Sequence, residues 1–228
     1  MFHTRARRTL AAAALATATV IATSGAATAP ADPVVPEQVL VTADLDGDGI
    51  PDPVTLRQLS PGTQLLRVAL REEILDALIG GDDTVPLPLI PPRPSDLDGD
   101  GRAELVLTVV VGANTLTYEV WRYDEDHGLR PVTDESGAPW RLYEGGGVAA
   151  TSGYGCATPH PGEARRLPFA VEARWDESRT EQEPIRYDGE VVTYEIAGGV
   201  ARPVGTAHVQ DVARDDPQVT TDPATCAA

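Results

Sequence analysis

The sequence feature that most constrains the fold is a six-residue word, D-L-D-G-D-G, found at residues 44–49 and again at residues 96–101. The similarity extends to nine positions, 44–52 and 96–104, with carboxylates at the first, third, fifth and ninth places of both. Glycine at the sixth place permits the positive φ that a sharp turn needs. The fold must therefore accommodate the same acidic turn twice.

The chain around these turns alternates apolar and polar residues, which is the period of a β-strand with one buried face. The pattern predicts strands at residues 38–45, 53–59, 104–112, 115–123, 169–175 and 190–196. A tight hairpin turn is expected at residues 112–114. Residues 65–81 favour a strand followed by a short helix or turn.

A second repeat supports the same fold class. Residues 117–132 and 193–204 share the letters TYE, then an aliphatic residue, a turn and RPV, so each is expected to form a β-hairpin. Residues 84–94 are rich in proline and predict an extended connector. A chain that reuses a hairpin and an acidic loop is predicted to be all-β, with repeated antiparallel hairpins or blades.

The acidic turns are suited to a hard cation. A chain that turns around an ion directs alternate side chains inward, and Ca²⁺ takes six to eight oxygen ligands at about 2.3–2.6 Å. The seventh residue, Ile50 or Arg102, would offer its backbone carbonyl, for which the side chain is irrelevant. Mg²⁺ fits less well because it demands strict octahedral geometry. The remaining alternative is a pair of acidic turns without metal.

An EF-hand is disfavoured by the residues that follow each loop. Its twelfth position needs a bidentate glutamate and a helix after it. Here the twelfth residues are Thr55 and Leu107, and both loops lead into predicted strands.

The loops resemble the calcium loops of FG-GAP and VCBS repeat proteins, in which D-x-D-x-D-G-x-x-D/E lies between strands of a β-propeller blade. The resemblance covers about residues 38–122 and implies a partial or small β-propeller-like fold with two Ca²⁺ sites. The ligands that it implies are Asp44, Asp46, Asp48, the Ile50 carbonyl and Asp52, and then Asp96, Asp98, Asp100, the Arg102 carbonyl and Glu104.

The N-terminus has the pattern of a cleaved secretory signal: Arg5, Arg7 and Arg8, then a run of small apolar residues, then an Ala-x-Ala exit. Cleavage is expected after Ala31, with Ala27 as the alternative, and a membrane anchor is disfavoured. Residues 32–228 are then a single secreted domain without a membrane span. Its two loop repeats lie at about residues 38–60 and 94–123.

The two cysteines, Cys156 and Cys226, are expected to form a disulfide, because the chain is predicted to be exported and their number is even. The bond would tie down the C-terminal part of the domain.

The charge balance narrows the range of partners. The chain has 18 basic residues, all of them arginine, against 35 acidic ones, for a net charge of −17. Such a surface repels nucleic acid and anionic lipid and suits cations. The lack of lysine excludes a phosphate-loop lysine, a Schiff-base lysine and a Ser–Lys catalytic pair.

Catalytic motifs are weak. Ser152 lacks the glycine two places earlier that a nucleophile elbow uses, and no sequence partner marks His127, His160 or His208 as catalytic. The sequence therefore predicts a secreted, non-catalytic calcium-binding protein in which calcium is mainly structural.

Two alternatives to this function stay open. One is an extracellular adhesin-type module that binds a glycan or a protein; the more distant one is a secreted hydrolase. Trp121 and Tyr123 share a strand face that could stack on sugars, although the pattern favours a place in the core.

Overall fold

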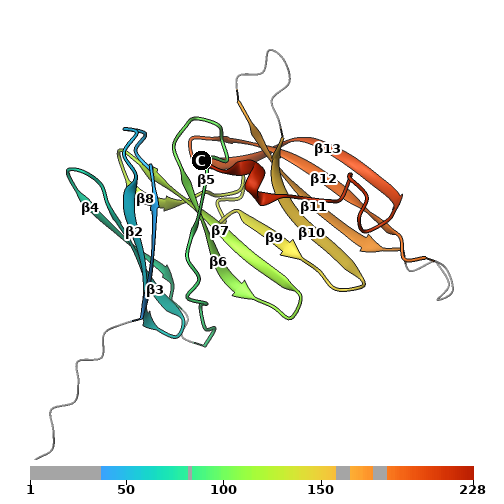
Figure 1. Cartoon of the computed structure of the whole chain (residues 1–228), viewed down its shortest axis with the longest axis horizontal. Helices are drawn as coiled ribbons and strands as arrows, with labels where there is room; N and C mark the ends of the chain where they lie inside the picture. The colour runs from blue at the N-terminus through green and yellow to red at the C-terminus, as the bar shows by residue number, and fades with distance from the viewer. Residues whose placement is uncertain (1–36, 82–83, 158–164, 177–183) are drawn as a thin grey trace, which may run out of the picture. The chain divides into compact units, whose positions relative to one another are not determined.

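Antiparallel strands make up nearly all the regular structure of the described residues (Figure 1). The computed structural model describes residues 37–81, 84–157, 165–176 and 184–228, and these belong to one unit, Pro36–Ala228. The predicted signal segment, residues 1–31, lies outside the described residues. Among the described residues, no helix is long and apolar enough to cross a membrane. The all-β class predicted from the sequence is confirmed.

The first sheet is a four-stranded antiparallel meander in the order β1-β2-β3-β4. The alternation of apolar and polar residues explains why these segments form strands, because every second side chain is buried and the side chains between them face outward. Its strands are β1 (Gln38–Ala43), β2 (Asp52–Ser60), β3 (Thr63–Ala69) and β4 (Ile74–Gly80).

The expected short helix or turn before Gly80 is wrong, because this segment is strand β4. Leu75, Ala77 and Ile79 face inward at a period of two, and β4 pairs with β3 along its whole length. Arg67 and Asp76 lie opposite each other in that register, with Arg67 Nη2 2.7 Å from Asp76 Oδ2. Cross-strand pairing therefore decides a segment whose local sequence is ambiguous.

The second sheet has nine strands in the order β13-β12-β11-β10-β9-β7-β6-β5, with β8 paired to β7 outside this path. Neither sheet closes into a ring within the described residues. The strands of the second sheet are β5 (Arg93–Ser95), β6 (Glu104–Val111), β7 (Thr115–Asp124), β8 (Gly128–Pro131), β9 (Arg141–Gly145), β10 (Ala150–Ala157), β11 (Leu167–Trp175), β12 (Tyr187–Ala197) and β13 (Val200–Val212).

The predicted turns are confirmed by strand pairing. The β6–β7 turn is closed by a bond from Gly112 N to Thr115 O at 2.8 Å. The two TYE segments form the β7–β8 and β12–β13 hairpins. The proline-rich connector leads into β5 and contacts the first sheet, where Leu87 N donates to Pro61 O at 2.7 Å.

Both acidic loops occupy the same topological position. Each joins the first and second strands of a run of four consecutive antiparallel strands, β1–β4 or β5–β8. The registers also agree: Ala43 pairs with Asp52, and Ser95 pairs with Glu104. The sequence repeat is therefore also a repeat of strand, loop and register.

The inner face of the first sheet and one face of β6 contribute to a single hydrophobic cluster. Strand β6 is buried on both faces, since Leu105 and Leu107 lie in this cluster while Val106 lies in a second one. Trp121 is 8% exposed and belongs to the first cluster, and Tyr123 packs against it. The predicted core location is confirmed for Trp121, whereas Tyr123 is only partly buried and its hydroxyl donates to Glu73 Oε1 at 3.2 Å.

Arg93 links four strands of the second sheet. Its Nη1 lies 3.2 Å from Glu144 Oε2 and donates to the Tyr154 hydroxyl at 2.6 Å, while the Tyr118 hydroxyl donates to Glu144 at 2.9 Å. The guanidinium carbon is 5.3 Å and 5.7 Å from the ring centroids of Tyr118 and Tyr154, which is cation–π distance. Burial, followed by the bond to Glu144, raises the pKa of Tyr118, so this hydroxyl keeps the proton that it donates.

Replacing Arg93 by alanine should lower the free energy of unfolding by about 1–2 kcal/mol, a value reduced for the partial exposure of the pair. The matched control is Arg67→Ala, which breaks the exposed pair with Asp76 and should change stability little. Urea denaturation of both variants measures the difference. Equal midpoints for the two variants would contradict a structural role for the Arg93 cluster.

Candidate metal centres

The first acidic loop, between β1 and β2, gathers three carboxylates near solvent. Ligand atoms of Asp44, Asp46 and Asp48 all lie within 4.8 Å of one another. Asp44 accepts backbone bonds from Gly47 N at 2.8 Å and from Gly49 N at 2.9 Å. The loop is thus folded around its first carboxylate.

The second acidic loop, between β5 and β6, gathers a different and more buried set. Ligand atoms of Asp96, Asp98 and Glu104 lie within 4.8 Å of one another, and Glu104 is only 3% exposed. Asp96 Oδ1 is buried and has no hydrogen-bond partner among the described residues. A buried carboxylate oxygen without a donor is costly unless something positive lies beside it.

The repeated sequence D-L-D-G-D-G has a structural explanation. The leucine at the second place, Leu45 or Leu97, is almost fully buried, and its backbone N–H donates to the carboxylate at the ninth place. In the first loop Leu45 N is 3.0 Å from Asp52 Oδ2, and in the second Leu97 N is 2.8 Å from Glu104 Oε2. The fourth and sixth glycines all have positive φ, between 69° and 89°. Each loop therefore has a hydrophobic anchor, two left-handed turns and an inward carboxylate.

The predicted ligands are brought together in part. Asp52 lies outside the tight group of the first loop, and Asp100 lies outside that of the second. Asp52 nevertheless interacts electrostatically with the other carboxylates of its loop. Burial raises the pKa of Asp52, and the charges of Asp46, Asp44 and Asp48 raise it further. Asp100 accepts a backbone bond from Arg102 N at 2.8 Å and stays exposed.

The electrostatics of the second loop favour a cation. Burial, and then the charge of Asp100, raises the pKa of Asp98 to about 6. Burial, and then the charge of Asp98, raises the pKa of Glu104 to about 8. A bound cation would remove this repulsion and favour the ionised form of both carboxyl groups. The oxygen-only donor set matches Ca²⁺ or Mg²⁺ rather than a softer metal.

The two loops are in direct contact. Ala103 N of the second loop donates to Asp44 O of the first at 2.7 Å. The side chain of Arg102 lies against Gly47, where an added Cβ would be 3.0 Å from Arg102 Cγ, and its Nη2 pairs with Glu125 at 3.0 Å. The two loops are therefore neighbours, although their carboxylates form separate groups.

The predicted disulfide is confirmed, and it positions the chain end against the second loop. Cys156 and Cys226 are bonded, and Cys226 O accepts a hydrogen bond from Asp96 N at 2.8 Å. Thr225 Oγ1 accepts from Cys156 N at 2.8 Å. The C-terminal tail is thus held against the backbone at the start of the second loop, a relation that sequence spacing does not reveal.

One acidic group was not predicted. Asp124, Asp126 and His127, in the β7–β8 turn, also place ligand atoms within 4.8 Å of one another. His127 Nδ1 is 2.7 Å from Asp124 Oδ1, and Asp126 N donates to the same oxygen at 3.1 Å. These bonds describe a capped, exposed turn, and the D-x-D-H letters are its only sequence signal.

The weak catalytic candidates have other partners. The Ser152 hydroxyl donates to Gly145 O at 3.4 Å, and His208 Nδ1 lies 3.3 Å from Glu190 on the neighbouring strand. His160 lies outside the described residues.

Comparisons of this chain with known protein families, with curated proteins and with solved structures find no match.

Proposed function

We propose that this chain is a secreted, non-catalytic calcium-binding repeat protein in which two Ca²⁺ ions mainly stabilise the fold. The observation that carries the proposal is the second loop. There Asp96, whose buried Oδ1 has no hydrogen-bond partner among the described residues, groups with Asp98 and the buried Glu104. Such a cluster is unfavourable without a cation. The first loop has the same register and anchor, which supports a second ion.

The position of the loops supports a structural role for calcium. Each joins two adjacent antiparallel strands, so an ion that orders the loop also fixes the register of that pair. Binding to the folded state alone stabilises it by RT ln(1 + [L]/Kd). The proposal extends to the repeat, in which β1–β4 and β5–β8 are each one blade of a propeller-like arrangement.

Calorimetric titration of the mature chain should detect two bound Ca²⁺ ions. Dissociation constants of about 10⁻⁴–10⁻³ M or somewhat tighter are expected for extracellular modules. Mg²⁺ should bind more weakly, because flexible loops of carboxylates suit a larger ion. A chain that takes up no calcium, or that takes up Mg²⁺ as tightly, would overturn the proposal.

A further inference from the structure

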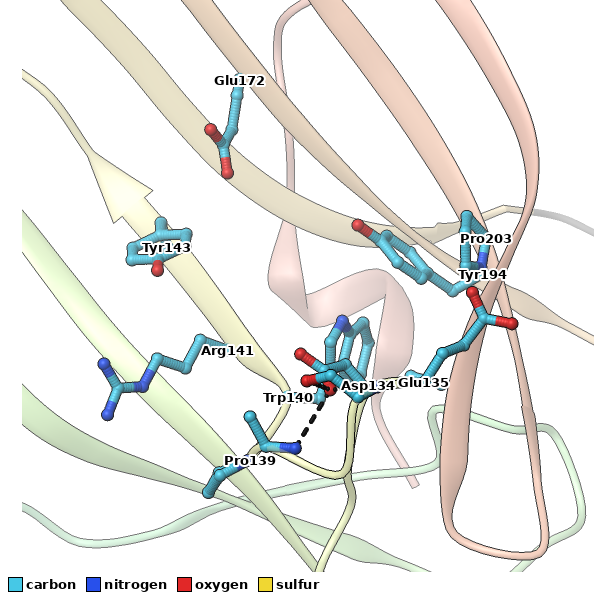
Figure 2. Close-up of a pocket in the computed structure, with 12 residues that line it drawn as sticks. Asp134, Glu135, Pro139, Trp140, Arg141, Tyr143, Glu172, Tyr194 and Pro203 are labelled. Atoms are coloured by element: carbon cyan, nitrogen blue, oxygen red, sulfur yellow. Dashed lines mark hydrogen bonds between the residues drawn. The ribbon is translucent and has the colours of Figure 1, made fainter.

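A groove of about 730 Å³ lies in the second sheet, away from both acidic loops (Figure 2). One wall is the turn before β9 together with β9 itself, and the other is formed by β11, β12 and β13. The strands separate here because β9 and β10 share a single residue pair, Gly145 with Ser152. One connection across the gap is Thr133, whose N–H donates to Gly199 O at 2.9 Å and whose carbonyl accepts from Ala201 N at 2.8 Å.

The apolar part of the groove consists of aromatic rings and prolines. Trp140 and Tyr194 lie with ring centroids 5.1 Å apart at 57°, and Pro139 and Pro203 lie in the opposing walls. Trp140 is only 5% exposed, so it contributes little open ring surface. Figure 2 shows Tyr143 on β9, across the groove from Glu172 and Tyr194.

The charges of the groove are negative and largely unneutralised. Among the described residues, Glu135 and Glu172 make no hydrogen bond or ion pair, and both are exposed. Asp134 is occupied by its own turn, accepting from Ser136 N at 2.8 Å. Among the described residues of the lining, the one arginine is Arg141, which pairs with Glu119 at 3.3 Å. Burial, and then the charge of Glu172, raises the pKa of Tyr194.

The acidic character continues beyond this groove. An adjoining hollow of about 380 Å³ shares Glu172 and Tyr194 with it and adds Asp188 and Glu190. In the part of this lining that the structure describes, Arg174 is the one basic residue. Together the two hollows form a trough with more carboxylates than arginines.

We propose that this trough binds an extended basic segment of a partner polypeptide. Extended proline-containing segments dock in grooves lined by aromatic side chains, and cations gain from ring faces and nearby carboxylates. The partly exposed rings of this groove are Tyr143 and Tyr194. The uncompensated Glu135 and Glu172 disfavour an anionic ligand. A neutral sugar is disfavoured because it would leave these two carboxylates without a cationic partner. This function goes beyond calcium binding, since no predicted calcium ligand lines the trough.

The test uses fluorescence anisotropy with the calcium-saturated mature chain and a labelled, end-capped hexapeptide of three Pro-Arg units. Binding should weaken by about tenfold between 0.05 and 0.5 M NaCl, because exposed charges are screened. The double variant Glu135→Gln with Glu172→Gln should weaken it by about tenfold. Both side chains are exposed, so the variant should melt like the wild type.

The matched control is Glu195→Gln with Asp215→Asn, which removes two exposed charges that lie outside both hollows. It should leave the affinity within about twofold. Three results would each overturn the proposal: no binding up to millimolar peptide, equal binding by the groove variant and the wild type, or tighter binding of neutral chitohexaose than of the Pro-Arg peptide.

Discussion

Replacing Cys156 and Cys226 by serine should lower the free energy of unfolding by about 4 kcal/mol, because their bond spans a sequence separation of 70 residues. For a domain of this size, the melting temperature should fall by roughly 10 °C. Scanning calorimetry of the variant beside the oxidised wild type measures this. An unchanged melting temperature would show that packing alone holds the C-terminal tail.

The same substitution should weaken cation binding at the second loop more than at the first. Asp96 N donates to Cys226 O at 2.8 Å, so freeing the tail loosens the strand end from which Asp96 projects. Adding Asp98→Ala to the serine variant isolates the first loop, whose calcium affinity should match that of Asp98→Ala alone. Equal losses at both loops would contradict this local coupling.

The second large effect concerns the stabilisation by calcium. At ten times Kd, each site contributes about 1.4 kcal/mol, and two sites together should raise the melting temperature by roughly 5–10 °C. Asp98→Ala should remove about half of this rise, because the carboxylates of the first loop form a separate group. The double variant Asp46→Ala with Asp98→Ala should melt at one temperature with calcium and with chelator.

The matched control for these variants is Asp126→Ala. Asp126 belongs to the third acidic group, in the β7–β8 turn, so its removal takes away a similar carboxylate outside both loops. The calcium response should then equal that of the wild type. A loss as large as that of Asp98→Ala would mean that calcium acts through general charge rather than through the two loops.

Much of the fold could be predicted because its strands have one-sided burial. Val54, Leu56, Leu66 and Val68 alternate with outward residues, and this period is visible in the sequence. The short helix or turn predicted at β4 was wrong because Glu72, Glu73 and Asp76 among leucines also suit a helix. Pairing with β3 makes this segment a strand, and the local sequence does not indicate such pairing.

The acidic loops could be predicted because their chemistry is local. Positive φ at Gly49 and Gly101, and the inward ninth carboxylates Asp52 and Glu104, follow from spacing alone. The unequal burial of the loops could not be foreseen. Nor could the contact between Asp96 and the tail that Cys226 fixes, because it joins residues distant in the sequence.

The groove could not be predicted either, for a similar reason. Trp140, Tyr194 and Glu172 come from separate segments and share no motif. They meet because β9 and β10 pair at one position only, and a sequence does not show where paired strands diverge.

The melting temperature of the wild-type mature chain, measured in saturating calcium and again in excess chelator, tests the central claim most directly. If two ions hold the loops and the strands that they join, the calcium form should melt several degrees higher, and magnesium at the same concentration should not restore the loss. A single melting temperature in calcium and in chelator would contradict a structural role for the ions.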